Sequence, residues 1–464
     1  MESLALTEII EAIGGVLLHG KPEGYATGIS TDTRTLKPGD LFFALKGEHT
    51  DGHAYLAKAV ESGAVGLVVS RKQDPSDIPG CANRPVIKVN DTLWALGDLA
   101  GHYRSKFDVK VIAVTGSVGK TTTKEMISSI LSRRWKTLKN EANFNNEIGV
   151  PLTIFKLDRT HDALVLELAM RGLGEIKRLA QISKPHVAVI TNIGLSHIER
   201  LGSQGAIAEA KSEVLSELPP DGIAVLNAED GYYELLRHKF SGKVVSFGSC
   251  KSADVSGVNV DPVEDGRCEC IIRTRDDEVR VSIPMIGHYN LYNALAAAAT
   301  GVALGFDLQT IRDGLESFTP PAMRMELVGS NAGYVILNDT YNASPASMTA
   351  ALKTLQALAG HKRKIAVLGD MLELGDYAQK AHRDIGAALR NAGVDILVAV
   401  GELARGFAEG ARKNGLPETA IQWYPDSIQA AKHLKNQVME GDAILVKGSR
   451  AMKMEEIVRI LLSD

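Results

Sequence analysis

A glycine-bounded loop between an apolar run and a threonine-rich continuation constrains the fold of this chain more than any other feature. It reads VIAVTGSVGKTTTKEM and covers residues 111–126. Residues 111–114 are apolar and mostly β-branched, as in a strand covered on both faces of a parallel sheet. The apolar residues that follow the threonines recur at helical spacing. The pattern predicts a buried strand, a tight loop and a helix, in that order.

This loop is predicted to bind the phosphates of a nucleoside triphosphate, because backbone N–H groups at a helix N-terminus converge on an anion. Lys120 would bring positive charge to the β- and γ-phosphates, and the Thr121 hydroxyl would be a ligand for Mg²⁺. Val114 stands where the strict pattern requires glycine, so the match is to a shortened variant bounded by Gly116 and Gly119. The alternative is a simple connecting loop with a surface lysine. The strand–loop–helix order favours phosphate binding.

Length and composition indicate an ordinary globular protein. The 464 residues correspond to about three domains of roughly 150 residues each. A net charge of −4 without a basic run argues against nucleic acid as a partner. Four scattered cysteines suit reduced thiols and not a disulfide framework. The acidic start MESLALTEIIEAIGG is unlike a signal peptide, and we see no apolar stretch long enough to span a bilayer, so we expect a cytoplasmic protein.

The alternation of apolar runs with helical patterns predicts an α/β protein of three domains. We expect a small N-terminal α/β domain over residues 1–84. A central P-loop ATPase-like domain with a mostly parallel sheet would cover 85–318, and a C-terminal Rossmann-like α/β domain 319–464.

Within these domains we expect a helix near 53–63 and a linker helix over 91–106. The central domain would have strands at 109–115, 163–169 and 186–191, and a β-rich insertion over 223–286. Four apolar segments of the last domain read as strands: YVILND, KIAVLGD, DILVAVG and DAILVKGS.

Polar side chains stand at the ends of several of these apolar strands. Glu167 ends the run ALVLELAM, where a carboxylate is costly unless it is paired or binds a metal. His197 follows another strand, and with Thr121 and Glu167 it could surround a magnesium ion. By pattern alone His197 would more often be a surface residue, and Lys211 a solvated lysine of a helix.

Two further clusters lie nearer the C-terminus. Asn290 and Asn293 fall at the start of a predicted helix, where asparagine suits capping. The segment NDTYNASP follows a strand of the last domain, at the edge where open sheets bind ligands. Lys447 and Arg450 follow another strand and could bind an anion.

Taken together, these stretches resemble the Mur ligases, the ATP-dependent amino-acid ligases of peptidoglycan precursor synthesis. The shared stretches, in the family's order, are TGSVGKTT, ELAM, TNIGLSHIE, AKSE, GHYNLYNALAA, MRME and NDTYN. A finer resemblance is to the branch of the family that adds D-alanyl-D-alanine to UDP-N-acetylmuramoyl-tripeptide. It rests on STDTRTLKPGDLFFALKGEHTDGHAY, NEANFNNEIGVPLT, NDTYNASPASM, VLGDMLELG and KGSRAMKMEE. The resemblance covers nearly the whole chain.

The resemblance implies ATP, magnesium and a modified lysine at one site. Catalysis would rest on Lys120, His197 and Lys211, of which Lys211 matches the family's carbamylated lysine. Its CO₂ adduct turns a cation into a metal-bridging carboxylate. Two magnesium ions would be bound by Thr121, Glu167, His197 and Lys211. The ATP contacts would be Gly116, Ser117, Val118, Gly119, Lys120, Thr121, Thr122, Asn290, Arg324 and Asp339.

The resemblance also assigns the substrate contacts. The first domain would bind the UDP moiety, and the muramoyl-peptide would lie between the domains. The implied contacts are Ser30, Thr31, Asp32 and Arg34 for UDP, Asn143, Asn145 and Asn146 for the peptide, and Tyr341 and Asn342 in the last domain. Ser344 departs from the family's more usual Asn-Pro pair and leaves that one contact open.

The reaction so implied is ligation through an acyl phosphate. The tripeptide carboxylate would attack the γ-phosphoryl group of ATP, and the amine of D-alanyl-D-alanine would then displace phosphate. Three alternatives stay open: the ligase that adds the third amino acid, a folylpolyglutamate synthetase, and a regulatory P-loop ATPase. The first would be expected to carry a DNPR-type motif, which this chain lacks. We expect a monomer, and the sequence does not tell which diamino acid the tripeptide carries.

Overall fold

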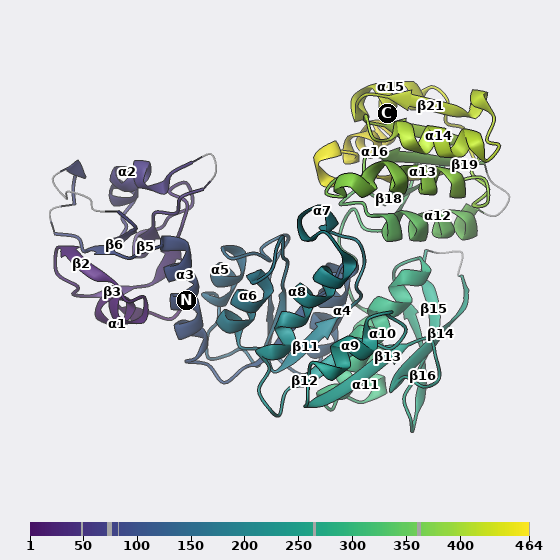
Figure 1. Ribbon diagram of the computed structural model, residues 1–464. Coiled ribbons are helices and arrows are strands. Elements are labelled where there is room, and N and C mark those ends of the chain that lie inside the picture. The colour runs from purple at the N-terminus through teal and green to yellow at the C-terminus, as the bar shows by residue number, and fades with distance from the viewer. Residues whose placement is uncertain (48–49, 72–76, 82, 263–265, 360–362, 464) are drawn as a thin grey trace.

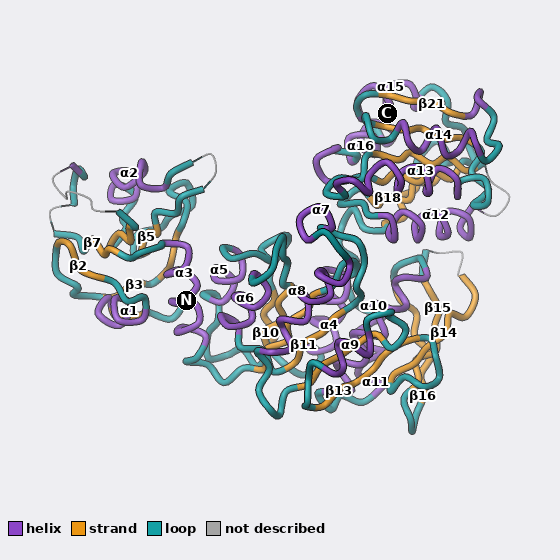
Figure 2. The backbone as a smooth tube through the Cα atoms, viewed as in Figure 1, coloured by secondary structure: helices purple, strands orange, loops and turns teal. Residues whose placement is uncertain are grey.

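The computed structural model describes residues 1–463 except 48–49, 72–76, 82, 263–265 and 360–362. Three α/β bodies follow one another along the chain, each built on its own sheet (Figure 1). Figure 2 shows helices lying on the faces of all three sheets. Among the described residues, none of the helices combines the length and the apolar character needed to cross a membrane.

The N-terminal body holds a five-stranded sheet in the order β2-β7-β6-β5-β4. Its strands β4 to β7 run parallel, and β2 is antiparallel to β7. The helix expected near 53–63 is confirmed as a 3₁₀ turn followed by an α-helix. The elements are β1 (Leu4–Ala5), α1 (Leu6–Ala12), β2 (Val16–His19), β3 (Tyr25–Ala26), β4 (Gly28–Ser30), β5 (Asp40–Phe43), η1 (Gly52–Tyr55), α2 (Leu56–Glu61), β6 (Gly66–Val69) and β7 (Val86–Lys88).

Helix α3 (Thr92–Arg104) joins this body to the central one, close to the predicted span of 91–106. The Asp91 side chain caps it by accepting from the backbone N–H groups of Leu93 and Trp94. The end of α3 is bonded to the central body. The buried Tyr103 hydroxyl donates to the Leu157 carbonyl over 2.7 Å. The buried Arg104 guanidinium donates to the Ser183 carbonyl over 3.0 Å.

The central body is a nine-stranded sheet in the order β16-β15-β14-β13-β12-β11-β8-β10-β9. The three predicted strands are present as β8, β10 and β11, which are adjacent and parallel. The β-rich insertion does not form a separate unit. It extends the same sheet, first with parallel strands and then with two antiparallel ones. The strands are β8 (Lys110–Thr115), β9 (Thr137–Lys139), β10 (Ala163–Glu167), β11 (Val187–Ile190), β12 (Ile223–Asn227), β13 (Lys243–Gly248), β14 (Val255–Pro262), β15 (Cys268–Arg273) and β16 (Glu278–Ile283).

Helices cover both faces of this sheet, which explains its continuous apolar strands. Along β8, Val111 and Ala113 pack into one core cluster and Ile112 and Val114 into the other. The helices are α4 (Lys120–Leu131), α5 (Gly149–Ile154), α6 (Glu175–Ser183), α7 (Ile198–Leu201), α8 (Gln204–Ser216), α9 (Tyr233–His238), α10 (His288–Ala303) and α11 (Leu308–Glu316).

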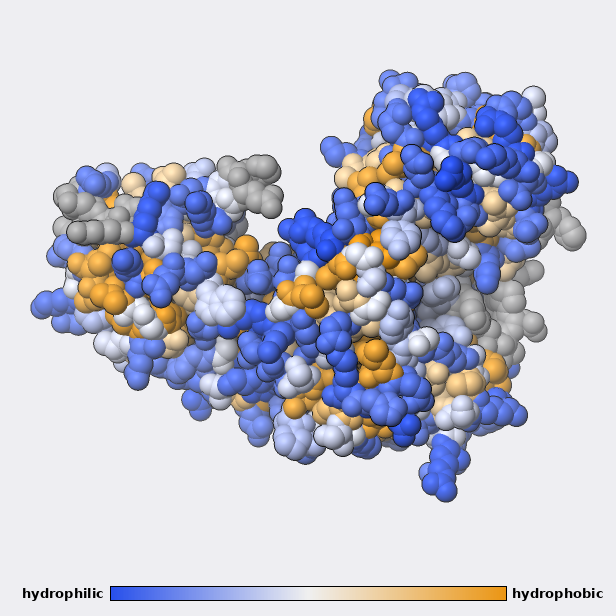
Figure 3. Space-filling view, in the orientation of Figure 1, coloured by the Kyte–Doolittle hydropathy of each residue, from blue (hydrophilic) through white to orange (hydrophobic). Residues whose placement is uncertain are grey.

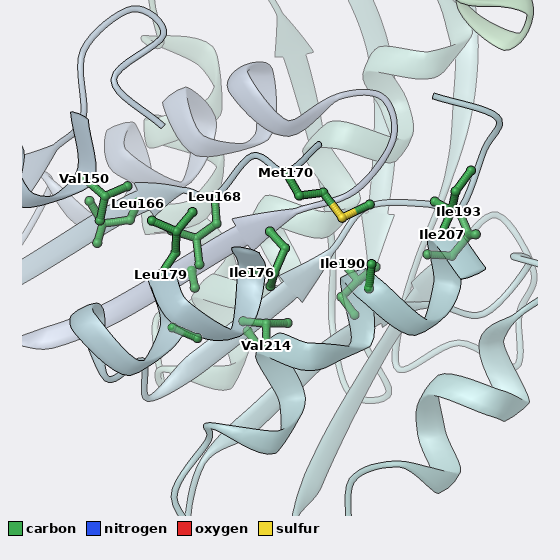
Figure 4. Packing of buried hydrophobic residues seen from close by; sticks show 14 of the residues in the cluster. Val150, Leu166, Leu168, Met170, Ile176, Leu179, Ile190, Ile193, Ile207 and Val214 are labelled. Carbon is green, nitrogen blue, oxygen red and sulfur yellow. The ribbon is translucent and has the colours of Figure 1, made fainter. Parts of the chain in front are cut away.

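Figure 4 shows the first of these two cores, where strand residues lie against the helices α6 and α8. Leu166 comes from β10 and Ile190 from β11, the strands on either side of β8, and Leu179 and Val214 come from the two helices. Each such side chain, when buried, contributes about 1.5–3 kcal/mol to stability. This packing holds the carboxyl ends of β8, β10 and β11 in fixed register, and the loops that follow them lie side by side.

The C-terminal body is a six-stranded sheet in the order β17-β18-β22-β19-β20-β21. The four predicted strands are present as β18, β19, β20 and β22, and all four are parallel. Sequence reasoning missed the edge strands β17 and β21. The elements are β17 (Glu326–Gly329), β18 (Val335–Asp339), α12 (Pro345–Ala359), β19 (Lys364–Gly369), η3 (Gly375–Tyr377), α13 (Ala378–Ala388), β20 (Ile396–Val400), α14 (Arg405–Lys413), η4 (Glu418–Ala420), β21 (Ile421–Tyr424), α15 (Ser427–Lys435), β22 (Ala443–Lys447), η5 (Arg450–Met452) and α16 (Glu455–Leu462).

The space-filling view shows an open recess between the N-terminal and C-terminal bodies, with the central body as its floor (Figure 3). The contact between the central and C-terminal bodies is closer, since α7 packs against η3 and α10 against α12. The carboxyl ends of the central parallel strands face this contact, and the candidate site lies there.

Candidate active site

The loop between β8 and α4 has a backbone that only glycine fits well at two positions. Gly116 has a φ of +143° and Gly119 a φ of +90°. A Cβ on Gly116 would lie 1.9 Å from the Thr191 hydroxyl, and one on Gly119 would lie 2.2 Å from the Asn293 side-chain oxygen. Both glycines are therefore required by conformation and by space. The sequence assignment of a glycine-bounded loop is confirmed in its geometry.

The ammonium of Lys120 lies over this loop. It donates to the Gly116 carbonyl over 2.9 Å and to the Ser117 carbonyl over 3.4 Å. Burial lowers the pKa of Lys120, and the nearby Arg324 lowers it further, whereas Glu167 raises it. A bound polyphosphate would add negative charge at this point and raise this pKa.

Glu167, which is only 3% exposed, forms hydrogen bonds through both carboxylate oxygens. One oxygen accepts from the Thr121 hydroxyl over 2.7 Å, and the other accepts from the Asn145 side chain over 2.8 Å. The carboxylate that sequence reasoning singled out therefore lies beside the hydroxyl expected to bind magnesium. Since these are hard oxygen donors at a phosphate loop, the pair suits Mg²⁺.

The C-terminal body contributes Arg324 to the same site. Its guanidinium donates to the Thr121 hydroxyl over 3.0 Å and stacks on the Tyr341 ring, 4.0 Å from the ring centroid. Behind it, Asp339 forms an ion pair with the buried Lys447 and accepts from the Met325 backbone N–H over 3.2 Å. Asp339 and Lys447 end the adjacent strands β18 and β22.

These groups line a cavity of about 320 Å³ between the central and C-terminal bodies. The central body supplies the phosphate loop with the start of α4, Asn143, Asn145, Glu167, His197 and the start of α10. The C-terminal body supplies Arg324, Met325 and the segment after β18. Nearly all predicted nucleotide contacts meet here: Ser117, Val118, Gly119, Lys120, Thr121, Thr122, Asn290, Arg324 and Asp339.

Comparison with known proteins agrees with this geometry. Three family models match the chain: "Mur ligase family, catalytic domain" over residues 25–104, "Mur ligase middle domain" over 114–301, and "Mur ligase, glutamate ligase domain" over 323–450. A UDP-N-acetylmuramoyl-tripeptide–D-alanyl-D-alanine ligase of Bacillus subtilis is 38% identical over 458 residues, which are 98% of this chain and 98% of the relative. The chain belongs to the Mur ligase family.

Solved structures extend this likeness to three dimensions. A MurF from Acinetobacter baumannii has a TM-score of 0.92 and 33% identity, and the match covers 100% of both chains. A MurF ligase from Thermotoga maritima in complex with ADP has a TM-score of 0.83 and 27% identity, over 94% of this chain and 96% of that one. The division into three α/β bodies is thus that of the Mur ligases, as expected from the sequence.

Two residues that the resemblance assigned to metal have other partners in this Mur ligase. The His197 Nδ1 atom lies 2.8 Å from the Glu373 carboxylate of the C-terminal body. This hydrogen bond holds the pKa of Glu373 below its ordinary value. Lys211 is 1% exposed and donates to the Gly116 carbonyl over 2.9 Å, from behind the phosphate loop. Burial, and secondarily Lys120, holds the pKa of Lys211 well below its ordinary value.

The predicted substrate residues fall into two places. Asn143 and Asn145 line the cavity, as do Tyr341 and Asn342. The Asn146 side-chain oxygen instead accepts from the backbone N–H of Gly149, the first residue of α5, over 2.9 Å. The predicted uridine contacts lie at the carboxyl end of β4, whose last residue is Ser30. There the Ser30 hydroxyl bonds the Asp32 carbonyl over 3.0 Å, and the exposed Arg34 pairs with the Asp32 carboxylate at 2.6 Å. Thr31 lies between Ser30 and Asp32 in the chain.

The expectation that Asn290 and Asn293 cap a helix is wrong. Helix α10 begins at His288 after the N-cap residue Gly287, without a side-chain cap, and both residues lie inside it. The Asn290 amide donates back to the Ile286 carbonyl over 2.7 Å, and the Asn293 amide donates to the Asn290 side chain over 3.0 Å. The Asn293 oxygen accepts from Thr123 over 3.3 Å. The pair therefore ties α10 to the phosphate-loop helix.

Sequence reasoning missed three polar residues next to this site. Glu373 lies in the loop after β19, and nothing local marked its contact with His197. Lys124 and Asn140 are fully buried, but their neighbours in the sequence are polar, so nothing local marked their burial.

Proposed function

We propose that this Mur ligase joins D-alanyl-D-alanine to UDP-N-acetylmuramoyl-tripeptide, with cleavage of ATP to ADP and phosphate. The observation that carries the proposal is the contact of Thr121 with both Glu167 and Arg324. It places a phosphate-loop hydroxyl between a central carboxylate and an arginine of another domain. A site assembled from two domains can admit substrates when open and exclude water when closed. The relative from Bacillus subtilis carries this activity in its name.

ATP would lie with its phosphates on residues 116–122, and the 320 Å³ cavity supports this position. Lys120 would bond the β- and γ-phosphates, and Arg324 would approach the γ-phosphate from the C-terminal domain. Asn290 and Asp339 line the same cavity and would contact the rest of the nucleotide. The ADP bound by the Thermotoga relative supports the same choice of ligand.

Magnesium would be held at the phosphates by Thr121 and Glu167. The fit is good, because these side chains are already 2.7 Å apart and offer a hydroxyl and a carboxylate, the oxygen donors that Mg²⁺ prefers. Bound Mg²⁺ would neutralise phosphate charge during transfer. A second ion would involve His197 and Lys211. The contact with Glu373 uses the Nδ1 atom of His197, so the Nε2 atom would be the one to bind the metal.

Lys211 would act as a carbamate. Only a neutral amine attacks CO₂, and burial already favours the neutral form of this lysine. The adduct carries negative charge, so it would replace the present contact with the Gly116 carbonyl and offer oxygens toward the phosphate site.

The chemistry would proceed in two steps. The terminal carboxylate of the tripeptide attacks the γ-phosphorus, and ADP leaves, giving an acyl phosphate. The amine of D-alanyl-D-alanine then attacks the acyl carbon, and phosphate leaves. Lys120 and Arg324 would stabilise charge on the transferred group in the first step. Closure of the C-terminal domain would keep water from the acyl phosphate.

The precursor would extend from the N-terminal domain to the cavity. Ser30, Thr31, Asp32 and Arg34 would bind its uridine diphosphate end. Asn143, Asn145, Asn146, Tyr341 and Asn342 would bind the peptide end near the phosphates. We take residues 1–84, 85–318 and 319–464 as the three domains. We also propose a cytoplasmic monomer, and the four cysteines, which are thiols and not disulfides, support a reducing compartment.

The deciding experiment measures ADP release by the purified protein. We expect release to require both a UDP-muramoyl-tripeptide and D-alanyl-D-alanine, and precursors containing lysine or diaminopimelate will show which diamino acid is preferred. Release without D-alanyl-D-alanine at the full rate would point to a regulatory ATPase. Release with UDP-muramoyl-dipeptide and a diamino acid would point to the ligase of the preceding step, and release with folate and glutamate to a folylpolyglutamate synthetase.

A further inference from the structure

A lysine inside the phosphate-loop helix has no contact with the cavity and yet is 0% exposed. This is Lys124, one turn after Lys120 in α4. Its ammonium donates to the backbone carbonyl of Asn140 over 2.5 Å and lies 3.0 Å from the Glu125 carboxylate. Glu125 also pairs with Lys139. Burying a charge in this way is costly unless its bonds serve the structure around it.

The residue that Lys124 bonds is itself fully buried and directs three hydrogen bonds. Asn140 follows β9, and its side-chain oxygen accepts from the Glu167 backbone N–H over 2.9 Å. Its amide donates to the Glu167 carbonyl over 3.1 Å and to the Phe144 carbonyl over 2.9 Å. The side chain thus bonds both backbone groups of the residue whose carboxylate contacts Thr121.

Together with two bonds from Asn145, the bonds from Asn140 hold residues 140–146 across the end of β10. Asn145 donates from its side chain to the Glu167 carboxylate, and its backbone carbonyl accepts from Ala169 over 2.9 Å. The segment is therefore attached to the Glu167 region at three points. The Lys124 ammonium joins it to α4, and the Lys139–Glu125 pair and the Thr121–Glu167 contact join the same helix to the adjacent strands.

We propose that Lys124 is a positioning residue for the proposed magnesium–ATP site, acting through Asn140 on Glu167. Lys124 fixes the Asn140 peptide relative to α4. Asn140 fixes the backbone of Glu167, and the Glu167 carboxylate is then held against Thr121. Since α4 also carries Lys120 and Thr121, this chain of bonds sets the spacing between the phosphate loop and its carboxylate.

The choice of side chains agrees with this role. An apolar residue at position 124 would leave the Asn140 carbonyl buried without its donor. At position 140, aspartate would have no amide donors for the two carbonyls, and glutamine would be longer by one methylene. Partners that orient a metal ligand usually change metal affinity or activity by about 10–100-fold when they are lost.

The proposal rests on the proposed function only in that it takes Thr121 and Glu167 as metal ligands. Its test is therefore metal binding, which needs neither the muramoyl precursor nor D-alanyl-D-alanine. Mn²⁺ replaces Mg²⁺ as the probe, and its binding to the full chain is measured by electron paramagnetic resonance with a non-hydrolysable ATP analogue. Absence of ligase turnover with normal Mn²⁺ binding would reject the proposed function and leave Lys124 testable.

For Lys124→Met we expect Mn²⁺ affinity to fall by about 10-fold or more. We expect kcat to fall as well, with the KM for the muramoyl precursor changed less. Lys124→Arg should recover part of the Mn²⁺ affinity, because it restores a donor and a positive charge. Lys139→Met is the matched control: it removes the same charge and also contacts Glu125, but it does not bond Asn140. This control should bind Mn²⁺ as the parent does.

A purely structural lysine would lower the melting temperature of Lys124→Met and leave Mn²⁺ affinity within about twofold of the parent, which would overturn the proposal. If Lys124→Met does not fold, Asn140→Asp decides, since it removes the amide bonds while keeping the size of the side chain. The proposal requires weaker Mn²⁺ binding in Asn140→Asp. Parent-like affinity in that variant would overturn it.

Discussion

His197 of the central domain and Glu373 of the C-terminal domain form a direct contact of 2.8 Å between ring nitrogen and carboxylate. Both residues have left-handed backbone conformations, with φ of 67° and 63°. Such conformations are uncommon for residues other than glycine and carry strain of about 1–3 kcal/mol each, so the surrounding structure must hold them. From the strain and the contact together we infer that this pair helps to hold the C-terminal domain in its position on the central domain.

Glu373→Gln should loosen this arrangement. The pair is partly exposed, and such pairs contribute about 0–1 kcal/mol, so the ratio of closed to open molecules should change by at most about fivefold. Small-angle scattering of the ligand-free protein should show a larger radius of gyration for the variant. Glu402→Gln, an equally conservative change at an exposed site of the same domain, is the control and should leave the radius unchanged.

Acid should have the same effect on the parent protein. The hydrogen bond from His197 keeps the pKa of Glu373 below the ordinary 4.5, so its contribution to closure is present above 4.5. This contribution is lost when Glu373 is protonated, which happens as the pH falls from 4.5 through the lowered pKa of Glu373. The radius of the parent should then rise toward that of Glu373→Gln, whose own radius should not follow this titration. If the radius of gyration of the parent stays constant over this pH range, the His197–Glu373 contact does not hold the two domains together.

Lys120→Ala should abolish most ligase turnover without unfolding the protein. Lys120 bonds the loop carbonyls of Gly116 and Ser117, at the cavity and not in a core, so its loss removes phosphate stabilisation more than stability. Loss of one such electrostatic contact typically costs about 10²–10³-fold in kcat. Steady-state ADP release measures the effect, and circular dichroism checks the fold. Lys413→Ala, at an exposed lysine of α14, should behave as the parent.

The main features of the fold could be predicted because long apolar strands and glycine loops are local signals. β8, β10 and β11 are buried on both faces, and the uninterrupted apolar runs of their sequences predict this burial. The edge strands β9, β17 and β21 are three or four residues long and only partly buried, so their pattern resembles that of loops. Their pairing is decided by neighbours distant in the chain.

The candidate site was predictable only in part for the same reason. The phosphate loop and Glu167 could be found from their own strands, and the carboxyl-end rule then placed them at one sheet edge. The contact between His197 and Glu373 joins positions far apart in sequence and depends on how two domains meet. The capping expectation for Asn290 failed because asparagine at a helix start can also bond the preceding carbonyl, as it does with Ile286.

Nucleotide and precursor together should compact the protein. Arg324 already contacts Thr121, and it lies between Met323 and Met325, both with left-handed φ, close to Pro320 and Pro321. We expect this segment to rotate as the C-terminal domain closes over ATP. Scattering with a non-hydrolysable ATP analogue and the UDP precursor should give a smaller radius than scattering without ligands. Equal radii in the two states would count against domain closure.

The amine of Lys211 should be available to CO₂ near neutral pH. Because burial lowers its pKa well below 10.5, the folded protein releases a proton that the unfolded chain keeps. In the pH range between the lowered pKa and 10.5, this group's contribution to stability therefore rises with pH. With ¹³C-bicarbonate, the folded protein should show a carbamate resonance that disappears on unfolding and is absent from Lys211→Gln. A spectrum without that resonance in the folded parent would contradict the prediction.

Lys211 should be needed for its acquired negative charge and not for its own positive charge. A free ammonium beside the proposed magnesium site would repel the metal, whereas a carbamate supplies the oxygens that Mg²⁺ prefers. Lys211→Ala should lose most ADP release, and formate or acetate should restore part of it by filling the space left behind the Gly116 carbonyl. Lys211→Arg should stay inactive with or without formate, because a guanidinium keeps its charge and forms no such adduct. A folded Lys211→Arg enzyme with near-parent turnover would show that this buried lysine serves only to support the phosphate loop.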